Sequence, residues 1–218
     1  MPIEGDVEAL VRRALAEPAS EPAFTWGIDL THAKPAAVVV PLLPSPLRAL
    51  LVVRGKELRD HAGEVGFPGG KPEPGDASLE ATALRELEEE VGLARESVAI
   101  AGTLAPVPVI TGRYLIHPFV GLVDPKATAR VASTGEIQRL VELPIDRLFD
   151  EPFAISAVRR TVLGRTKLIP FFPLDDCVLY GASAYIFWEL LSRLAAVLGR
   201  TIPEPRMVEG NPWGNRYG

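Results

Sequence analysis

The chain has little cysteine and no surplus of positive charge. Its 218 residues include one cysteine and carry a net charge of −5 at pH 7. Cys177 therefore cannot form a disulfide within the chain, and a cytoplasmic location is the simplest expectation. General nucleic-acid binders usually have a basic surplus, so we expect no nucleic-acid partner.

Long apolar runs are also absent. No window approaches the roughly 18 consecutive apolar residues of a membrane span, so we expect no membrane association. The N-terminus lacks the basic region and apolar run of a signal peptide. Apolar residues nevertheless make up 47% of the chain, enough to bury a core. We predict one domain over residues 1–218, with its core at about 36–199, an N-terminal helix and a proline-rich tail.

The spacing of apolar residues predicts a mixture of helices and strands. We expect helices at residues 3–16, 78–91, 144–149 and 177–198, and irregular structure at 17–35 and 55–77. We expect strands at 36–43, 49–54, 98–104, 115–123 and 137–143, and a hairpin at 158–172. Because helices and strands mix without a regular alternation, the pattern indicates an α/β sandwich around a mixed sheet.

Three glutamates share one face of the helix predicted at 78–91. Glu86, Glu89 and Glu90 stand at positions i, i+3 and i+4. Like charges at this spacing cost roughly 0.2–0.5 kcal/mol per pair, and the helix dipole disfavours negative charge near the last turn. A divalent cation would reverse this repulsion, because hard cations such as Mg²⁺ bind carboxylate oxygens. A solvated acidic face is the alternative, and the residues before the helix favour the metal.

A glycine-rich turn leads into this helix. Residues 67–75 read FPGGKPEPG. The paired glycines Gly69 and Gly70 let the backbone approach a ligand or metal closely. The carbonyl of Gly70 could add a metal ligand, and Lys71 could contact a phosphate. An ordinary turn is the alternative for two glycines taken alone.

Turn, helix and carboxylates together resemble the Nudix box, G-x5-E-x7-R-E-U-x-E-E-x-G-U, where U is bulky and apolar. Gly70 opens the box, and residues 85–93 match its second half without a mismatch. The first half departs from the consensus. It is one residue longer, and Ala77 stands where a glutamate is expected. Asp76 or Glu80 could supply the missing carboxylate.

The resemblance implies a Nudix-type α/β/α sandwich around a mixed sheet and a pyrophosphatase that depends on Mg²⁺ or Mn²⁺. Glu86 and Glu90 would be the principal metal ligands. Glu89 would bind a second metal or its water, and the carbonyl of Gly70 would complete the shell. The metals would lower the pKa of the attacking water and orient it.

The resemblance also implies roles in catalysis beyond metal binding. Arg85 would orient a box glutamate. The general base would be a box glutamate, Glu89 or Glu90, or a carboxylate on a later loop. Glu136 precedes a predicted strand and could serve as that later carboxylate, with an ordinary loop acid as the alternative.

A second resemblance covers residues 50–70, LLVVRGKELRDHAGEVGFPGG. It is similar to LLTxRSx3Rx3Gx3FPGG, the signature of the coenzyme A pyrophosphatase branch of Nudix enzymes, with departures at Val52 and Gly55. Residues 180–184, YGASA, resemble a helix start found late in that branch. Coenzyme A carries a diphosphate and a 3′-phosphate, which cations and arginine forks bind well. The candidate substrate-binding residues are Arg54, Arg59, His61, Lys71, Gly69 and Gly70.

The implied reaction is hydrolysis of coenzyme A or acyl-CoA to 3′,5′-ADP and 4′-phosphopantetheine or its acylated form. A Nudix hydrolase for ADP-ribose, dinucleotides or nucleoside triphosphates is an alternative. A Nudix-fold module that senses a nucleotide without hydrolysing it is an alternative of another class. The complete glutamates argue against a sensor, and the 50–70 signature argues against other substrates. The sequence leaves the oligomeric state open, a homodimer included.

Overall fold

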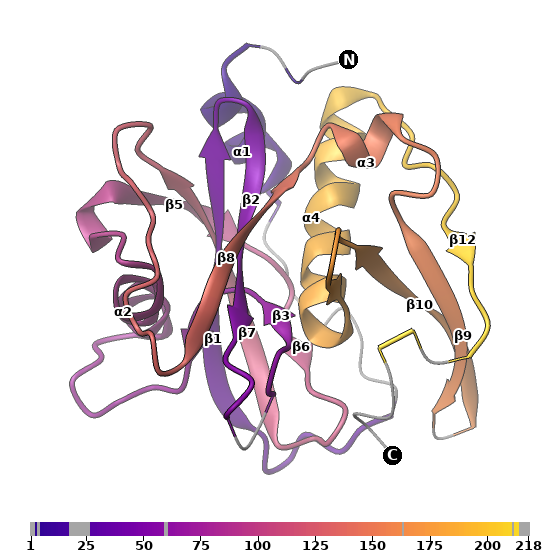
Figure 1. Ribbon diagram of the computed structural model, residues 1–218, viewed down its shortest axis with the longest axis horizontal. Coiled ribbons are helices and arrows are strands. Elements are labelled where there is room, and N and C mark those ends of the chain that lie inside the picture. The colour runs from indigo at the N-terminus through magenta and orange to yellow at the C-terminus, as the bar shows by residue number, and fades with distance from the viewer. Residues whose placement is uncertain are drawn as a thin grey trace.

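The computed structural model describes residues 3, 5–17, 27–58, 61–162, 164–210 and 212–213. Its helices are α1 (Val7–Ala14), α2 (Leu79–Val91), α3 (Arg147–Asp150) and α4 (Gly181–Leu198), with a 3-10 turn at Arg95–Ser97. Its strands are β1 (Lys34–Pro44), β2 (Leu47–Arg54), β3 (Val65–Gly66), β4 (Gly69–Gly70), β5 (Val98–Thr103), β6 (Val107–Pro108), β7 (Tyr114–Val123), β8 (Ile137–Pro144), β9 (Ser156–Val162), β10 (Arg165–Pro173), β11 (Val178–Leu179) and β12 (Arg206–Met207). Figure 1 shows a twisted sheet with helices on both sides.

The sheet is mixed, as the sequence predicts. Strand β1 pairs antiparallel with β2 and parallel with β7. The strand order is β12-β9-β10-β11-β3-β2-β1-β7-β5, and β8 pairs with β2. The chain therefore brings β3 and β8, which flank β2 on opposite edges, next to the end of β2 at Arg54.

Most predicted elements agree with the structure to within a few residues, and the first and last helices are both shorter than predicted. The helix expected at 177–198 begins only at Gly181, because Leu179 pairs with Val65 and belongs to β11. The first helix spans Val7–Ala14 rather than 3–16, because the Asp6 carboxylate accepts the amide of Ala9 and caps it. The region expected to be irregular at 55–77 contains the two-residue strands β3 and β4, and residues 18–26 of the expected 17–35 loop lie outside the described residues.

Alternating residues of β2 separate two hydrophobic cores. Leu50 and Val52 pack with α2 on one face of the sheet. Leu51 and Val53 face the other side, where they join the core built around α4 and α1. Because side chains alternate along a strand, each residue of β2 is committed to one face, and Arg54 falls on the face of α2.

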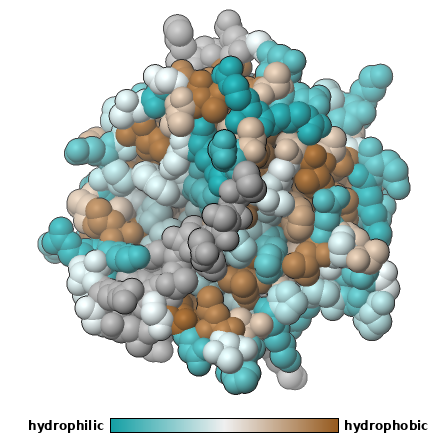
Figure 2. All heavy atoms as spheres, turned by 180° about the vertical axis from the view of Figure 1, so that it is seen from behind, coloured by the Kyte–Doolittle hydropathy of each residue, from teal (hydrophilic) through white to brown (hydrophobic). Residues whose placement is uncertain are grey.

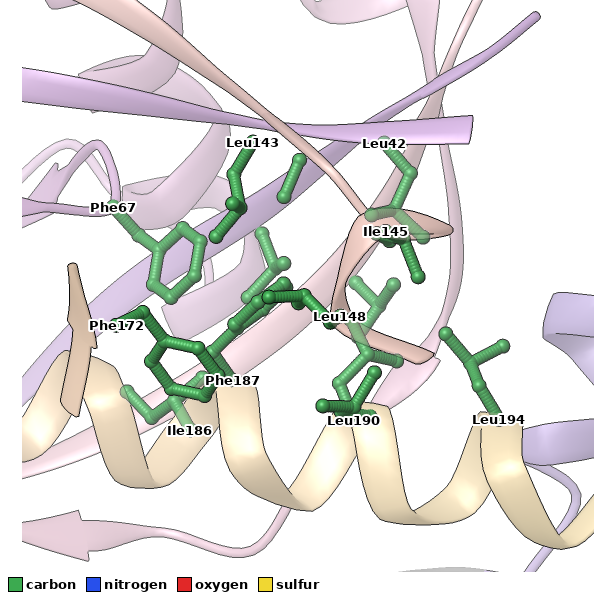
Figure 3. Close-up of a cluster of buried hydrophobic side chains, with 14 of the residues drawn as sticks. Leu42, Phe67, Leu143, Ile145, Leu148, Phe172, Ile186, Phe187, Leu190 and Leu194 are labelled. Carbon is green, nitrogen blue, oxygen red and sulfur yellow. The ribbon is translucent and has the colours of Figure 1, made fainter. Parts of the chain in front are cut away.

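Helix α4 forms the centre of the larger core, as Figure 3 shows. Phe187, Leu190 and Leu194 of α4 are fully buried, and the ring of Phe187 lies edge-on to Phe172 with centroids 5.0 Å apart. Among the described helices, α4 has the length and apolar composition of a membrane span, with 39% of its residues buried. A core helix has the same two properties, and α4 packs in the core.

The rear face of the molecule carries hydrophobic residues in small groups separated by polar ones, as Figure 2 shows. Two surface hollows, of about 240 and 540 Å³, lie next to Asp124 and Pro125. None of the described candidate site residues lines either of these two hollows.

Candidate active site

Capping residues and a buried stripe fix the position of α2. The Ser78 hydroxyl accepts the amide of Ala81 at 3.1 Å and caps the helix start. Gly92, at φ 67°, ends the helix in the left-handed conformation that favours glycine. Leu87 and Val91 are fully buried against the sheet. Glu86 and Glu90 consequently face the glycine-rich turn, and Glu90 also faces the end of β2.

Glu90 is the most buried of the three glutamates, with 2% of its surface exposed. One carboxylate oxygen accepts the amide of Gly69 at 3.1 Å, and the other accepts Arg54 at 3.3 Å. The pKa of Glu90 is raised to about 7, mainly by burial and also by the negative charges of Glu86 and Glu136, while Arg54 and the Gly69 amide oppose the shift. The buried position of Glu90 therefore disfavours the charged form of its carboxylate.

Glu86 lies directly against the glycine-rich turn. A Cβ atom added to Gly70 would lie 2.2 Å from a carboxylate oxygen of Glu86, so any other residue here would displace that carboxylate. Burial raises the pKa of Glu86, as do the charges of Glu89 and Glu136, while Arg85 lowers it. The absence of a side chain at position 70 is what lets the carboxylate approach the turn.

Arg85 ties the turn to the helix. Its guanidinium donates to Asp76 at 3.0 Å, to Glu89 at 3.0 Å and to the carbonyl of Lys71 at 3.1 Å. It also lies 3.1 Å from Glu86. The hydrogen bond to Asp76 is the main cause of a raised Arg85 pKa. Arg85 thus contacts two of the three box glutamates, Glu86 and Glu89.

Asp76, one of the two acids that could supply the missing carboxylate of the box, pairs with Arg85. It accepts Arg85, the amide of Glu73 and the hydroxyl of Thr82. The Arg85 hydrogen bond holds the pKa of Asp76 well below its usual range, whereas Glu80 is exposed in the first turn of α2. Thr82 is not among the site residues predicted from the sequence. Its signal is a polar residue within the helix, and its complete burial is seen only in the structure.

The three glutamates do not sit in one ready cluster. The Glu89 side chain is 56% exposed and turned toward Arg85. Within the described residues, no three His, Cys, Asp or Glu side chains form a group able to hold a metal. Glu86 is close enough to Glu90 for its charge to raise the pKa of Glu90. Both residues offer only carboxylate oxygens, and they lie beside the glycine-rich turn. Oxygen ligands of this kind suit a hard divalent cation.

Glu136 lies at the same end of the sheet as Arg54. Its carbonyl accepts the amide of Gly55 at 2.7 Å, and the following residue pairs with Arg54. Its side chain is exposed, and its charge contributes to the raised pKa values of Glu86 and Glu90. The structure thus places this loop carboxylate near the two box glutamates.

The remaining predicted substrate residues are spread around the turn. His61 contacts Glu64 at 2.8 Å. Lys71 lies with its ammonium 5.1 Å from the ring centre of Tyr114. Arg59 lies outside the described residues. Arg54 contacts the box glutamate Glu90, and its buried Nε atom has no hydrogen-bond partner among the described residues.

The family of the chain follows from its similarity to known proteins. The NUDIX domain matches residues 33–163, a range that includes every candidate site residue. The chain belongs to the Nudix family. It is therefore a Nudix hydrolase, an enzyme that hydrolyses pyrophosphate bonds, and Nudix hydrolases generally use divalent metal ions.

Relatives of this Nudix hydrolase bear the same family name. A protein of Photorhabdus laumondii, described as an uncharacterized Nudix hydrolase NudL, is 34% identical over 163 residues, which cover 73% of this chain and 84% of that protein. A protein of Escherichia coli O1:K1 with the same description is 43% identical over 117 residues, 53% of this chain and 59% of that protein. The match thus spans less than two thirds of the E. coli relative.

A solved structure described as a MutT protein of Methanosarcina mazei also resembles this Nudix hydrolase. Its TM-score is 0.48 at 15% identity, and the match covers 77% of this chain and 97% of that chain. The NUDIX domain match and the Photorhabdus laumondii relative show that the chain belongs to this family.

Proposed function

We propose that this Nudix hydrolase cleaves the diphosphate of coenzyme A and acyl-CoA. Water forms a new bond to one phosphorus while the bridging P–O bond breaks, which releases 3′,5′-ADP and 4′-phosphopantetheine or its acylated form. The observation that carries the proposal is the position of Arg54. This arginine of the 50–70 signature contacts Glu90, so a phosphate-binding side chain stands at the expected metal carboxylates.

We further propose Mg²⁺ or Mn²⁺ as the metal. Glu86 and Glu90 would hold it, with the carbonyl of Gly70, and Glu89 would bind a second ion or its water. When bound, the metal neutralises phosphate charge and lowers the pKa of the attacking water. The carboxylates tolerate their mutual repulsion because Arg85 and Arg54 hold them in place.

The remaining proposed roles belong to residues of the turn and the later loop. Arg54 and Lys71 bind the phosphates, and the paired glycines let the diphosphate approach the backbone. Arg85 positions the box glutamates. Glu136 takes the proton of the attacking water, a role supported by its charge acting on Glu86 and Glu90. A general base must lie within hydrogen-bond reach of that water.

A substrate panel tests the proposal. The protein with Mg²⁺ or Mn²⁺ is incubated with coenzyme A, ADP-ribose, NADH, diadenosine polyphosphates and dATP, and the products are identified. We expect the highest kcat/KM for coenzyme A, with 3′,5′-ADP as a product. A clear preference for ADP-ribose, a dinucleotide or dATP would replace coenzyme A as the substrate, and no turnover of any compound would favour a sensor.

Dephospho-coenzyme A tests whether the 3′-phosphate is read. We expect its kcat/KM to be lower than that of coenzyme A, because the arginines of the signature lose a phosphate partner. Arg48 offers a matched control on the same strand, where it pairs with Glu142 away from the site. The Arg48→Gln variant should keep the preference for coenzyme A. Equal rates for both compounds with the unchanged protein would show that the 3′-phosphate is not recognised.

A further inference from the structure

The side chain of Trp213 covers a second group of aromatic and basic residues. Its ring lies parallel to that of Tyr180, with centroids 5.1 Å apart and planes at 7°. Phe171 meets it edge-on at 5.8 Å, and the guanidinium of Arg160 lies 5.9 Å from its centre. We call the surface formed by Tyr180, Phe171 and Arg160 the aromatic slot.

The aromatic slot and Arg54 both lie on the side of the sheet that faces away from the core of α4. Leu179 pairs with Val65, which pairs with Val53, and all three point into that core. Side chains alternate along extended chain, so the next residues point away from it: Arg54 contacts Glu90 of α2, and Tyr180 packs with Phe171 and Trp213. Tyr180 stands two strand spacings, about 10 Å, from β2.

The slot is bordered by positive charge. Arg160 of β9 lies directly opposite Lys167 of β10 in the antiparallel register. The chain has a net charge of −5 yet places two cations side by side here, on the face that Val158 and Ile169 share with Tyr180. Both side chains are donors that bind phosphate well.

We propose that the aromatic slot is the subsite for the adenosine end of the substrate. The side chain of Trp213 occupies this subsite in the free protein and competes with the adenine base for the ring of Tyr180. The base stacks on Tyr180 in place of the indole ring, and the 3′-phosphate lies near Arg160 and Lys167. Aromatic rings accept nucleobases because every base has a π-face, and an indole is a close match in size to a purine. The inference rests on the proposed function, since it locates part of the same substrate.

Adenosine 3′,5′-bisphosphate is the probe that tests the inference. It is titrated into the full chain without metal, and binding is followed by calorimetry and tryptophan fluorescence. We expect the emission of the unchanged protein to shift as Trp213 leaves the slot. The Trp213→Ala variant should bind the probe several-fold more tightly, because no indole competes. Equal affinity for both proteins, with no shift in emission, would overturn the inference.

Arg160 provides a second readout that a merely structural role would not affect. The Arg160→Gln variant should bind the bisphosphate several-fold more weakly but bind adenosine 5′-monophosphate unchanged, because only the former has a 3′-phosphate. Phe153, an aromatic residue that is 64% exposed beside Arg206, is the matched control. The Phe153→Ala variant should bind both probes normally. An equal loss for both probes in Arg160→Gln would contradict the phosphate assignment.

Turnover separates this inference from the proposed function. If the bisphosphate displaces Trp213 but coenzyme A is not hydrolysed, the proposed substrate fails and the subsite stands. If coenzyme A is hydrolysed with the same KM in the unchanged protein, Trp213→Ala and Arg160→Gln, the proposed function stands and the subsite fails.

Discussion

At the residue scale, Glu90 is a buried carboxylate with few hydrogen-bond donors around it. It accepts one backbone amide, that of Gly69, and one guanidinium, that of Arg54. Burial of a carboxylate favours the neutral form, and its pKa is raised accordingly. Such a residue contributes little to stability, so its place in the fold is best explained by the chemistry it performs.

The Glu90→Gln variant is expected to lose turnover by orders of magnitude while it keeps the fold. Glutamine has the same shape and retains an oxygen for the Gly69 amide, but it cannot supply the negative charge that a divalent cation needs. Steady-state kinetics and far-UV circular dichroism measure the two effects. Glu88, which pairs with Arg95 on the surface of the same helix, is the control, and Glu88→Gln should be fully active. Near-normal turnover of Glu90→Gln would make the metal assignment wrong.

The Gly70→Ala variant tests the close approach of the turn to α2. The added methyl group would lie 2.2 Å from the Glu86 carboxylate and displace it. A misplacement of about 1 Å can cost about 100-fold in rate, so we expect a loss of that order in kcat. Gly75→Ala is the matched control, because its Cβ would meet nothing within 4 Å. Equal activity of the two variants would count against a role for the Glu86 position.

At the scale of elements, the link between the glycine-rich turn and α2 depends on one ion pair. Asp76 and Arg85 are both almost fully buried, with side chains 6% and 10% exposed. The carboxylate also accepts the amide of Glu73 and so closes the turn. Loss of this ion pair should increase the mobility of the glycine-rich turn and weaken its attachment to α2.

The Asp76→Asn variant should be less stable than the unchanged protein at pH 7. The folded-state pKa of Asp76 lies below its ordinary value near 3.9, so its stabilisation is fully present above that value and is lost as the pH falls below it. The difference between the two proteins in urea unfolding should therefore narrow below about pH 4. Asp176, 70% exposed beside Arg139, is the surface control. A difference of constant size from pH 7 to pH 3 would contradict this assignment.

At the scale of the whole molecule, α4 joins the two halves of the wide sheet. Its buried residues belong to a single core that includes Leu51 of β2 and Phe172 of β10, and Figure 3 shows Phe172 beside Phe187 of α4. The halves therefore should not unfold separately, because each would expose the same helix.

The Leu190→Ala variant tests this shared core. Leu190 is fully buried, and truncation of such a leucine costs about 2–5 kcal/mol. We expect urea unfolding followed by tryptophan fluorescence and by far-UV circular dichroism to shift together, with coincident midpoints. Leu168→Ala, at a position that is 52% exposed, should change stability by less than about 0.5 kcal/mol. Separate midpoints for the two signals would indicate two independent units.

The sequence predicts most elements of the fold because their signals are local. The alternation in β2, the apolar stripe of α2 and the glycine at its end each depend on residues within a few positions. The bounds of α4 could not be predicted in the same way. Residues 178–179 are apolar like the helix that follows, and only their pairing with β3 makes them a strand.

The sequence by itself determined that Glu86, Glu89 and Glu90 share a helix face beside paired glycines, because helical geometry follows from local spacing. Only the tertiary structure decided that Glu90 is buried against Arg54, that Asp76 and not Glu80 holds Arg85, and that Trp213 covers Tyr180. The partners in the first and last of these pairs lie more than thirty positions apart in the sequence, and Asp76 was one of two equivalent acids. Such contacts depend on how strands align across the whole sheet, which no local pattern specifies.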